Sequence, residues 1–194
     1  MADETSWQEP DWRAPLDEAA VLRAIPPTAT MTGMFLDAVA KLGRDKGHPP
    51  SSARARYTPF HTYPLVEHCQ ILVEVARAIH PKVPMRESLR RLGRGAPYVL
   101  MKSTVGRVVL GSVDGPHAIL EAMARSYMLH MRPGSLAVEP RGVRAAVVRM
   151  NEIYNFLDSH NVGVFEGVLA YAKVEGRVRI RRKTATSAEL WCEW

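Results

Sequence analysis

The residues of this chain that most readily bind metals or cofactors are its histidines and its two cysteines. The histidines are His48, His61, His68, His80, His117, His130 and His160. A metal ion needs several such ligands converging in space. His68 and Cys69 are neighbours in a helical segment, where adjacent side chains point about 100° apart, and His61 precedes that helix. Cys69 also falls on an apolar stripe, where cysteine behaves as a small core residue. These spacings predict no metal site.

Motifs that mark nucleophilic or phosphate-binding enzymes are missing from the sequence. No Gly-x-Ser-x-Gly elbow occurs, and Gly93 and Gly95 are not followed by the Lys-Ser/Thr pair of a phosphate loop. Glu166 is unusual because it lies inside an apolar helical segment. If this acid is buried, it marks a site for acid–base chemistry; if it faces outward, it is a surface residue. We predict no catalytic residue, and an enzyme of unknown class built on Glu166 is the alternative.

Arginines at helical spacing are the candidates for anion binding. Arg90 and Arg94 are four residues apart and share a helix face, and Arg107 follows nearby in the sequence. Guanidinium groups bind phosphate and carboxylate through two parallel hydrogen bonds. The same segment also fits a solvated helix face on which Glu87 pairs with Arg91. We favour the solvated face and keep Arg90, Arg94 and Arg107 as the anion-binding candidates.

The net charge of +6 arises in residues 51–150, which carry 15 basic and 6 acidic side chains, whereas residues 1–50 carry more acidic than basic ones. The basic residues are single or in short clusters, without the zinc-finger or aromatic signatures of nucleic-acid readout. Because charge alone gives only salt-dependent attraction, nucleic-acid association through this basic middle is a further alternative and not the main prediction. No apolar run reaches the ~20 residues of a membrane span, which excludes an integral membrane protein. The acidic start is not a secretory signal, and two distant cysteines fit a reducing compartment, so we expect a cytoplasmic location.

Seven methionines fall mostly at core-like positions. They are Met31, Met34, Met101, Met123, Met128, Met131 and Met150. Flexible methionine side chains can line an adaptable apolar pocket, and they can equally fill gaps in a core. Both interpretations stay open.

Apolar spacing and helix-stop residues predict that the first two thirds of the chain are helical. The expected helices cover residues 17–23, 30–42, 64–80, 84–92, 98–109 and 114–132. The break at residues 93–97 rests on two glycines and a proline. Residues 1–15 predict an extended arm, and the Gly-, Pro- and Ser-rich residues 43–63 predict a mobile loop or an insertion. Residues 16–194 are expected to form one domain.

The last third of the chain predicts a hairpin, a helix and a second hairpin. Residues 136–138 and 143–150 are β-branched strands around a turn. Residues 162–172 return to helical spacing, with Gly163 and Gly167 on one face where another element can approach closely. Helices followed by two hairpins indicate an α+β fold, in which N-terminal helices pack on an antiparallel sheet of about four strands.

The register of the terminal hairpin can be predicted from its side chains. Apolar residues alternate with charged ones in both strands, and matching the apolar faces aligns them. The predicted pairs are Val178–Cys192, Ile180–Leu190, Arg177–Glu193, Arg179–Trp191 and Arg181–Glu189. The arginines of one strand then meet acids and an indole of the other, which favours ion pairs and a cation–π contact over a nucleic-acid-binding stripe.

Five segments, taken in order, resemble a paralogous family of unknown function from myxobacteria. They are IPPTATMTGMF, YTPFHTYPLVEHC, LRRLGRGAPYVLMKSTVGRVVLG, NVGVFEGVL and AELWCEW. The resemblance runs from about Leu16 to Trp194. This family is similar to a superfamily that includes the transport-particle (TRAPP) subunits, the vinyl-reductase-type ligand-binding domains and the heme nitric-oxide-binding domains. The resemblance implies N-terminal helices, an antiparallel sheet, a glycine-containing helix and a closing hairpin. It also implies binding of acyl chains, other apolar molecules, heme or partner proteins, often by a dimer.

The sequence departs from the heme-binding relatives in their motif. Those relatives carry Tyr-x-Ser-x-Arg and a helical axial histidine, whereas the nearest stretch here, residues 126–132, has its serine and arginine at other offsets from Tyr127. The comparison therefore implies that heme is not bound, and we predict no cofactor. The cysteine cluster of the vinyl-reductase type is reduced to Cys192. We predict a non-catalytic binding or scaffold domain, a homodimer that binds a partner protein or an apolar small molecule.

Overall fold

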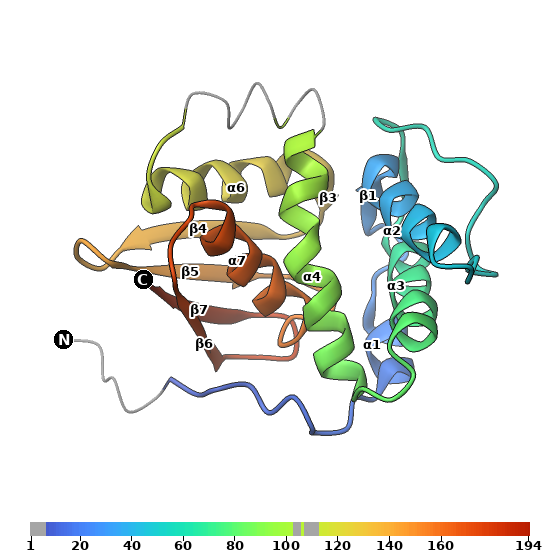
Figure 1. Cartoon of the computed structure of the whole chain (residues 1–194), viewed down its shortest axis with the longest axis horizontal. Coiled ribbons are helices and arrows are strands. Elements are labelled where there is room, and N and C mark those ends of the chain that lie inside the picture. The colour runs from blue at the N-terminus through green and yellow to red at the C-terminus, as the bar shows by residue number, and fades with distance from the viewer. Residues whose placement is uncertain (1–6, 103–105, 107–112) are drawn as a thin grey trace.

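A four-stranded antiparallel sheet carries helices on one of its faces (Figure 1). The computed structural model describes residues 7–102, 106 and 113–194. The strands of this sheet are β4 (Ser135–Pro140), β5 (Ala145–Asn151), β6 (Arg177–Arg182) and β7 (Ala188–Glu193), in the order β4-β5-β7-β6. The helices are α1 (Glu18–Ala24), α2 (Gly33–Asp45), α3 (Leu65–Ile79), α4 (Met85–Lys102), α6 (Pro116–His130) and α7 (His160–Tyr171). The predicted α+β class is confirmed.

The terminal hairpin has the predicted register. Val178 lies opposite Cys192 and Ile180 opposite Leu190, and these apolar side chains pack into the core beneath α7. On the other face, Arg181 pairs with Glu189 at 2.5 Å. The expected cation–π contact forms differently, because the guanidinium of Arg181 lies 4.5 Å from the ring centre of Trp7. The charged face of this hairpin is therefore neutralised largely within the chain.

The N-terminal arm supplies that tryptophan and covers the edge of the sheet. Gln8 forms two backbone hydrogen bonds with Ile180 of β6, at 3.0 and 2.9 Å. The arm then runs past α4, where the ring of Trp12 lies 4.6 Å from the guanidinium carbon of Arg90. An edge strand left open is a template for pairing with another chain, and the arm blocks it at this point.

A second, three-stranded sheet was not predicted. It consists of β1 (Thr30–Thr32), β2 (Thr62–Pro64) and β3 (Met131–Arg132), in the order β2-β1-β3. Residues 30–32 were expected to open a helix, but the helix begins at Gly33. Strands of two or three residues are too short to leave an alternating pattern in a sequence, and only the tertiary structure brings these three together.

Helix α4 is continuous through residues 93–97, where the sequence predicted a break. Pro97 lies inside the helix, and Gly93 serves packing and not a turn. A Cβ atom on Gly93 would stand 2.1 Å from the carbonyl oxygen of His160 at the start of α7. The helix thus tolerates residues of poor helix propensity because α7 packs closely against it. The expected helix end at residue 109 lies outside the described residues.

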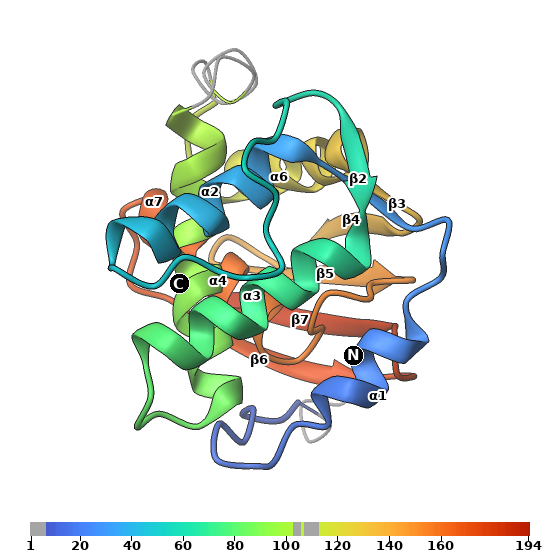
Figure 2. The same ribbon diagram turned by 90° about the vertical axis from the view of Figure 1, so that its right-hand side faces the viewer.

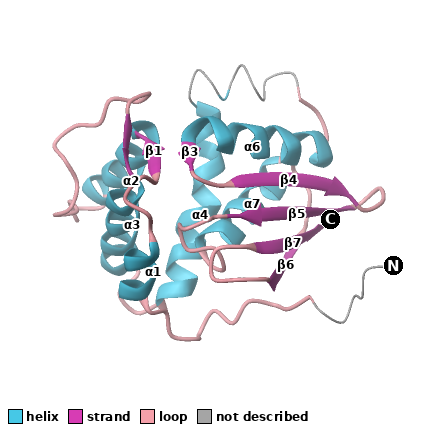
Figure 3. Cartoon of the chain, turned by 180° about the vertical axis from the view of Figure 1, so that it is seen from behind, coloured by secondary structure: helices cyan, strands magenta, loops and turns pink. Residues whose placement is uncertain are grey.

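Two lobes meet at α4. The helical lobe contains α1, α2 and α3 with the small sheet, and the sheet lobe contains β4–β7 with α6 and α7. Figure 3 shows α6 and α7 behind the strands, and Figure 2 shows α2 and α3 in front of the sheet. Each lobe has its own cluster of buried apolar residues, and Tyr127 packs against both. None of the described helices is long and apolar enough to cross a bilayer.

Residues 46–61 form the irregular loop that the composition predicts, and α3 anchors this loop. The backbone N–H groups of Ser51 and Ser52 donate to the Glu74 carboxylate, at 2.6 and 3.2 Å. Arg54 forms a two-pronged ion pair with Glu67, which also accepts a 2.6 Å hydrogen bond from Tyr57. Burial and the bond to Glu67 raise the pKa of Tyr57 to about 12.

Candidate functional site

A cavity of about 560 Å³ lies between the two lobes, which is within the usual size range of small-molecule sites. Its walls come from five helices far apart in the sequence. The apolar lining includes Phe35, Ala38, Val39, Leu42, Leu72, Leu92, Ala96, Leu100, Met123, Val164 and Phe165. Lys41 and Asp45 lie at the exposed part of the lining, where they pair at 2.6 Å. The helices that form each lobe therefore also enclose an apolar space at their junction.

Three histidines line this cavity, and each keeps a buried ring nitrogen without a hydrogen-bond partner among the described residues. These atoms are Nδ1 of His68, Nε2 of His130 and Nδ1 of His160. The Oγ atom of Ser126, also in the lining, is buried and unpartnered in the same sense. Buried polar atoms are nearly always hydrogen-bonded in folded proteins. Water or a bound molecule can supply the partners of such atoms.

His68 of α3 and His160 of α7 face each other. Their ring centres are 6.4 Å apart and their planes are almost perpendicular. Burial lowers the pKa of His68 to about 3, with a smaller contribution from His160, and burial lowers the pKa of His160 to about 4. Both imidazoles are therefore neutral at pH 7, which is the form that binds metals.

His130, the last residue of α6, is held by the small sheet. Its Nδ1 lies 3.1 Å from Oγ1 of Thr32, and its ring meets the edge of Phe35 at 5.4 Å between centres. Burial lowers the pKa of His130 as well. The remaining nitrogen, Nε2, is thus a neutral donor atom on a ring whose orientation is already set.

The cavity does not hold the ligand set of an isolated metal ion. Among the described residues, no group of three or more His, Cys, Asp or Glu side chains converges. Cys69 is buried in the helical core, and burial raises the pKa of its thiol far above its ordinary value. A metal that uses these histidines must therefore bring most of its own ligands.

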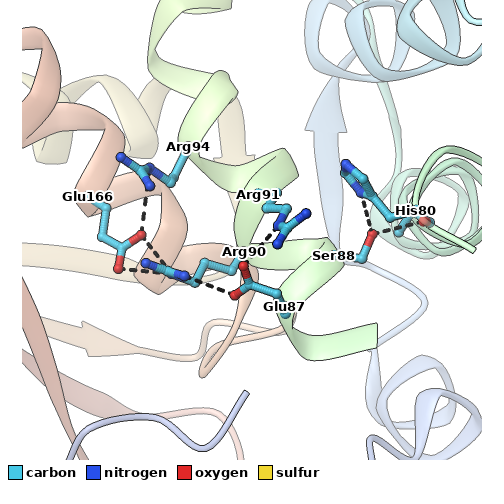
Figure 4. A network of polar contacts seen from close by, with 8 residues as sticks. His80, Glu87, Ser88, Arg90, Arg91, Arg94 and Glu166 are labelled. Atoms are coloured by element: carbon cyan, nitrogen blue, oxygen red, sulfur yellow. Dashed lines mark hydrogen bonds and ion pairs between the residues drawn. The ribbon is translucent and has the colours of Figure 1, made fainter. Parts of the chain in front are cut away.

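The structure places Glu166, Arg90 and Arg94 outside this cavity, in an ion-pair network between α4 and α7 (Figure 4). Arg90 Nε lies 2.8 Å from Glu166 Oε2, and its Nη1 lies 2.9 Å from Glu87. Arg94 lies 3.8 Å from the same Glu166 carboxylate. The anion partners of Arg90 are thus supplied by the chain itself. Arg107 lies outside the described residues.

Replacing Glu166 with glutamine should lower the free energy of unfolding by about 1 to 2 kcal/mol. The substitution removes a mostly buried carboxylate and so leaves Arg90 with one fewer charged partner. Chemical unfolding of Glu166→Gln measures this loss. The matched control is Glu121→Gln, whose pair with Arg125 is exposed and 3.6 Å long; it should change stability by less than about 0.5 kcal/mol. Equal effects of the two substitutions would contradict the packing role of Glu166.

The cavity histidines were not predicted as a group. A signal for one of them exists: Met123, Tyr127 and His130 follow one another at helical spacing, so His130 continues an inward-facing stripe. No comparable signal relates His68 to His160, because these residues belong to helices that only the fold brings together.

Several solved structures share this fold. An H-NOX protein from K. algicida, in its unliganded Fe(II) form, is 13% identical with a TM-score of 0.64, covering 84% of this chain and 96% of that one. An H-NOX protein from S. oneidensis, in its Fe(II)NO form, is 13% identical with a TM-score of 0.59, covering 84% and 98%. A variant of Tt H-NOX is 16% identical with a TM-score of 0.65, covering 84% and 94%.

The exclusion of heme that the sequence motif implied is wrong. Two further structures of this fold come from work on heme distortion in the H-NOX family and on heme redox potential. The misplaced serine and arginine around Tyr127 therefore do not exclude heme, because the exclusion considered one short motif and not the cavity.

No curated protein sequence matches the chain. The family model described as "Protein of unknown function (DUF2378)" matches residues 24–194. The chain thus belongs to the DUF2378 family and has the fold of the H-NOX domains.

Proposed function

We propose that this protein is a ligand-binding domain and that its interlobe cavity binds heme. The observation that carries the proposal is the set of buried, unpartnered imidazole nitrogens around a mainly apolar cavity. A heme brings a large apolar surface together with a metal that already has four nitrogen ligands. It therefore needs only an axial ligand from the protein, which a single neutral histidine supplies.

The residues of the cavity suit such a molecule. Phe35, Leu72 and Phe165 offer apolar contacts to a flat ring. His68, His130 and His160 are the candidates for the axial ligand. Lys41, at the exposed part of the lining, offers an ammonium group to the carboxylates of a heme, in place of its present partner Asp45. Bound heme supplies an iron centre for electron transfer or for binding a further small ligand.

The similarity of fold supports the proposal but does not identify the ligand, because the sequence identities to the three H-NOX structures are 13–16%. Fold alone does not imply function. The support specific to this chain is the burial of the three histidines, each with one ring nitrogen that has no hydrogen-bond partner among the described residues.

The test is a titration of the purified protein with hemin, followed by absorbance in the Soret region. We expect saturation at one hemin per chain with a spectrum distinct from free hemin. Ala38→Trp, which places an indole in the cavity, should weaken binding by at least about tenfold, the equivalent of roughly 1.4 kcal/mol. Val143→Trp is the control, because Val143 is 88% exposed on a turn and does not line the cavity.

A hemin spectrum that never departs from that of free hemin would overturn the proposal. So would equal hemin binding by wild type, Ala38→Trp and Val143→Trp, because that result indicates adsorption to the surface. A native mass spectrum of the protein as purified identifies any other ligand that occupies the cavity.

A further inference from the structure

We infer that the outer edge of β6 is a docking site for an acidic, tryptophan-bearing extended segment of another protein, and that the N-terminal arm, residues 7–15, competes for this edge from within the chain. The inference goes beyond the proposed heme binding, because none of the residues that carry it lines the interlobe cavity. Three observations carry it: the few bonds that hold the arm, the charge of β6, and the surroundings of Trp7.

Among the described residues, the arm pairs with β6 at a single position. Gln8 and Ile180 exchange both of their backbone hydrogen bonds, and no further pairing continues from them. Val178 directs its backbone N–H and C=O groups to the same side of β6, because hydrogen-bonded partners alternate along an antiparallel strand. The register places Pro10 opposite Val178, and proline has no N–H to donate. The arm therefore runs along this edge (Figure 1) but pairs with only part of it.

Strand β6 carries charge of one sign. It has no acidic residue, and its basic residues are Arg177, Arg179, Arg181 and Arg182. The acids of β7 balance this charge only in part, since Glu189 is shared between Arg181 at 2.5 Å and Lys183 at 3.5 Å. The arm adds Glu9, which pairs with Arg177 at 2.6 Å. An acidic segment is thus complementary in charge to this edge.

The same charge opposes pairing of β6 with β6 of a second copy of the chain. In an antiparallel pairing centred on Ile180, Arg179 of one copy would lie opposite Arg181 of the other. Like charges directly opposite each other destabilise a sheet. An edge strand can instead accept an extended peptide through its backbone groups. The occupant that fits is therefore an acidic strand of a different protein.

Trp7 shows which side chain fits beside this edge. Its ring centre lies 5.7 Å from that of Trp191 and 4.5 Å from the guanidinium carbon of Arg181, and the residue is buried. A ring between an indole and a guanidinium gains aromatic and cation–π attraction. The fit of the arm is incomplete, because Trp7 Nε1 and Arg179 Nε are buried without a partner among the described residues. The site thus suits a tryptophan, and the arm leaves two of its donors without a protein acceptor.

The arm keeps its place mainly because it is attached to the chain. A segment tied by a short linker acts at an effective concentration near the millimolar range, so few contacts suffice to hold it. A partner segment without proline at the position of Pro10 can pair with Val178 as well as with Ile180. It gains backbone hydrogen bonds that the arm does not form, and this gain allows a separate chain to displace the arm.

The probe is the hexapeptide Trp-Gln-Glu-Ala-Asp-Trp, which copies residues 7–12 with alanine in place of Pro10 and carries fluorescein at its C-terminus. Its binding is followed by fluorescence anisotropy. Trp7→Ala should bind the peptide at least about tenfold more tightly than wild type, because the arm then competes less well for the edge. Phe60→Ala is the control and should match wild type, because Phe60 is an exposed aromatic residue in the loop before β2.

Two altered peptides test the chemistry of the edge. In one, lysine replaces both acids, which turns attraction to the arginines into repulsion. In the other, alanine replaces the first tryptophan, which removes the ring that would take the place of Trp7. Each change should weaken binding to Trp7→Ala by at least about tenfold.

A double variant, Glu9→Cys/Arg179→Cys, locates the site. The register places these two residues opposite each other in a non-hydrogen-bonded pair, whose Cα spacing of about 4.5 Å suits a disulfide. The oxidised form ties the arm to β6 and should bind the acidic peptide at least about tenfold more weakly than the reduced form. Both natural cysteines, Cys69 and Cys192, are buried away from this edge.

Each outcome bears on a stated part of the inference. If Trp7→Ala does not bind the acidic peptide, or if the oxidised and reduced forms bind it equally, then the edge of β6 is not the docking site. If the lysine peptide binds as well as the acidic one, the preference for an acidic segment is wrong. A Trp7→Ala dimer in native mass spectra would identify a second copy as the occupant and overturn the inference. Should Trp7→Ala unfold, shown by circular dichroism, the oxidised and reduced forms of the double variant, which keep Trp7, decide the case.

Discussion

Replacing Gly163 with alanine should destabilise the protein by about 3 kcal/mol or more, because the added methyl group meets backbone on the neighbouring helix. A Cβ atom at Gly163 would stand 2.0 Å from the carbonyl oxygen of Arg90 and 2.8 Å from its carbonyl carbon. Gly93 meets the backbone of His160 from the other side in the same way. Backbone atoms cannot rotate away, so α4 and α7 must separate.

The same substitution should weaken hemin binding, because both helices line the cavity. Residues 95–100 of α4 and Val164 and Phe165 of α7 belong to its wall. Urea unfolding measures the stability, and the hemin titration measures the effect on the site. A loss below about 1 kcal/mol would contradict the close packing of the two helices.

Gly95→Ala is the matched control for this experiment. Gly95 lies in α4 as Gly93 does, but a Cβ atom there meets nothing within 4 Å in the described structure. Alanine is a better helix former than glycine, so Gly95→Ala should stabilise the protein by about 0.5 to 1 kcal/mol. Opposite signs at Gly163 and Gly95 would separate helix propensity from helix contact.

Lowering the pH from 7 to 5 should destabilise the protein by roughly 4 kcal/mol through His68 and His160 alone. Their pKa values in the folded protein, about 3 and about 4, lie below the ordinary value of 6.5. As the pH falls below about 6.5, the unfolded chain takes up protons that the folded chain refuses. Each histidine therefore removes on the order of 2 kcal/mol by pH 5. The stability is present above about pH 6.5 and is lost progressively toward about pH 4 and below.

Denaturant unfolding at pH 7 and pH 5 tests this expectation in wild type and in a His68→Leu/His160→Leu double variant. The double variant should lose much less stability between the two pH values. The lowered pKa values of His80 and His130 act in the same direction and leave it a residual loss. His61→Leu, at an exposed position, should behave as wild type. An equal loss in wild type and the double variant would show that the buried pair is not the cause.

The terminal hairpin could be predicted in detail because its information is local. Alternating apolar residues on two strands joined by a short turn allow one register that buries both apolar faces, and a shift by one residue would expose them. The pairing of Ile180 with Leu190 and of Arg181 with Glu189 follows from that rule. The approach of another element to Gly163 and Gly167 was also predictable, although its identity as helix α4 was not.

The break predicted at residues 93–97 shows where local rules fail. Two glycines and a proline lower helix propensity, but the cost is a few kcal/mol, which tertiary packing can offset. The packing of Gly93 against α7 is invisible in the local sequence, because its partner is His160. The local sequence likewise does not reveal the partner of Glu166, because that partner, Arg90, lies 76 residues away.

The sequence by itself determined the α+β class, most helices and the closing hairpin, because these depend on side-chain periodicity and on turns between neighbouring segments. Only the tertiary structure decided that α3, α6 and α7 bring His68, His130 and His160 to one cavity. The tertiary structure also decided that Thr32 holds His130 instead of capping α2. A histidine has the same identity in a core, on a surface or in a site, and its chemistry depends on burial and partners that the fold alone supplies.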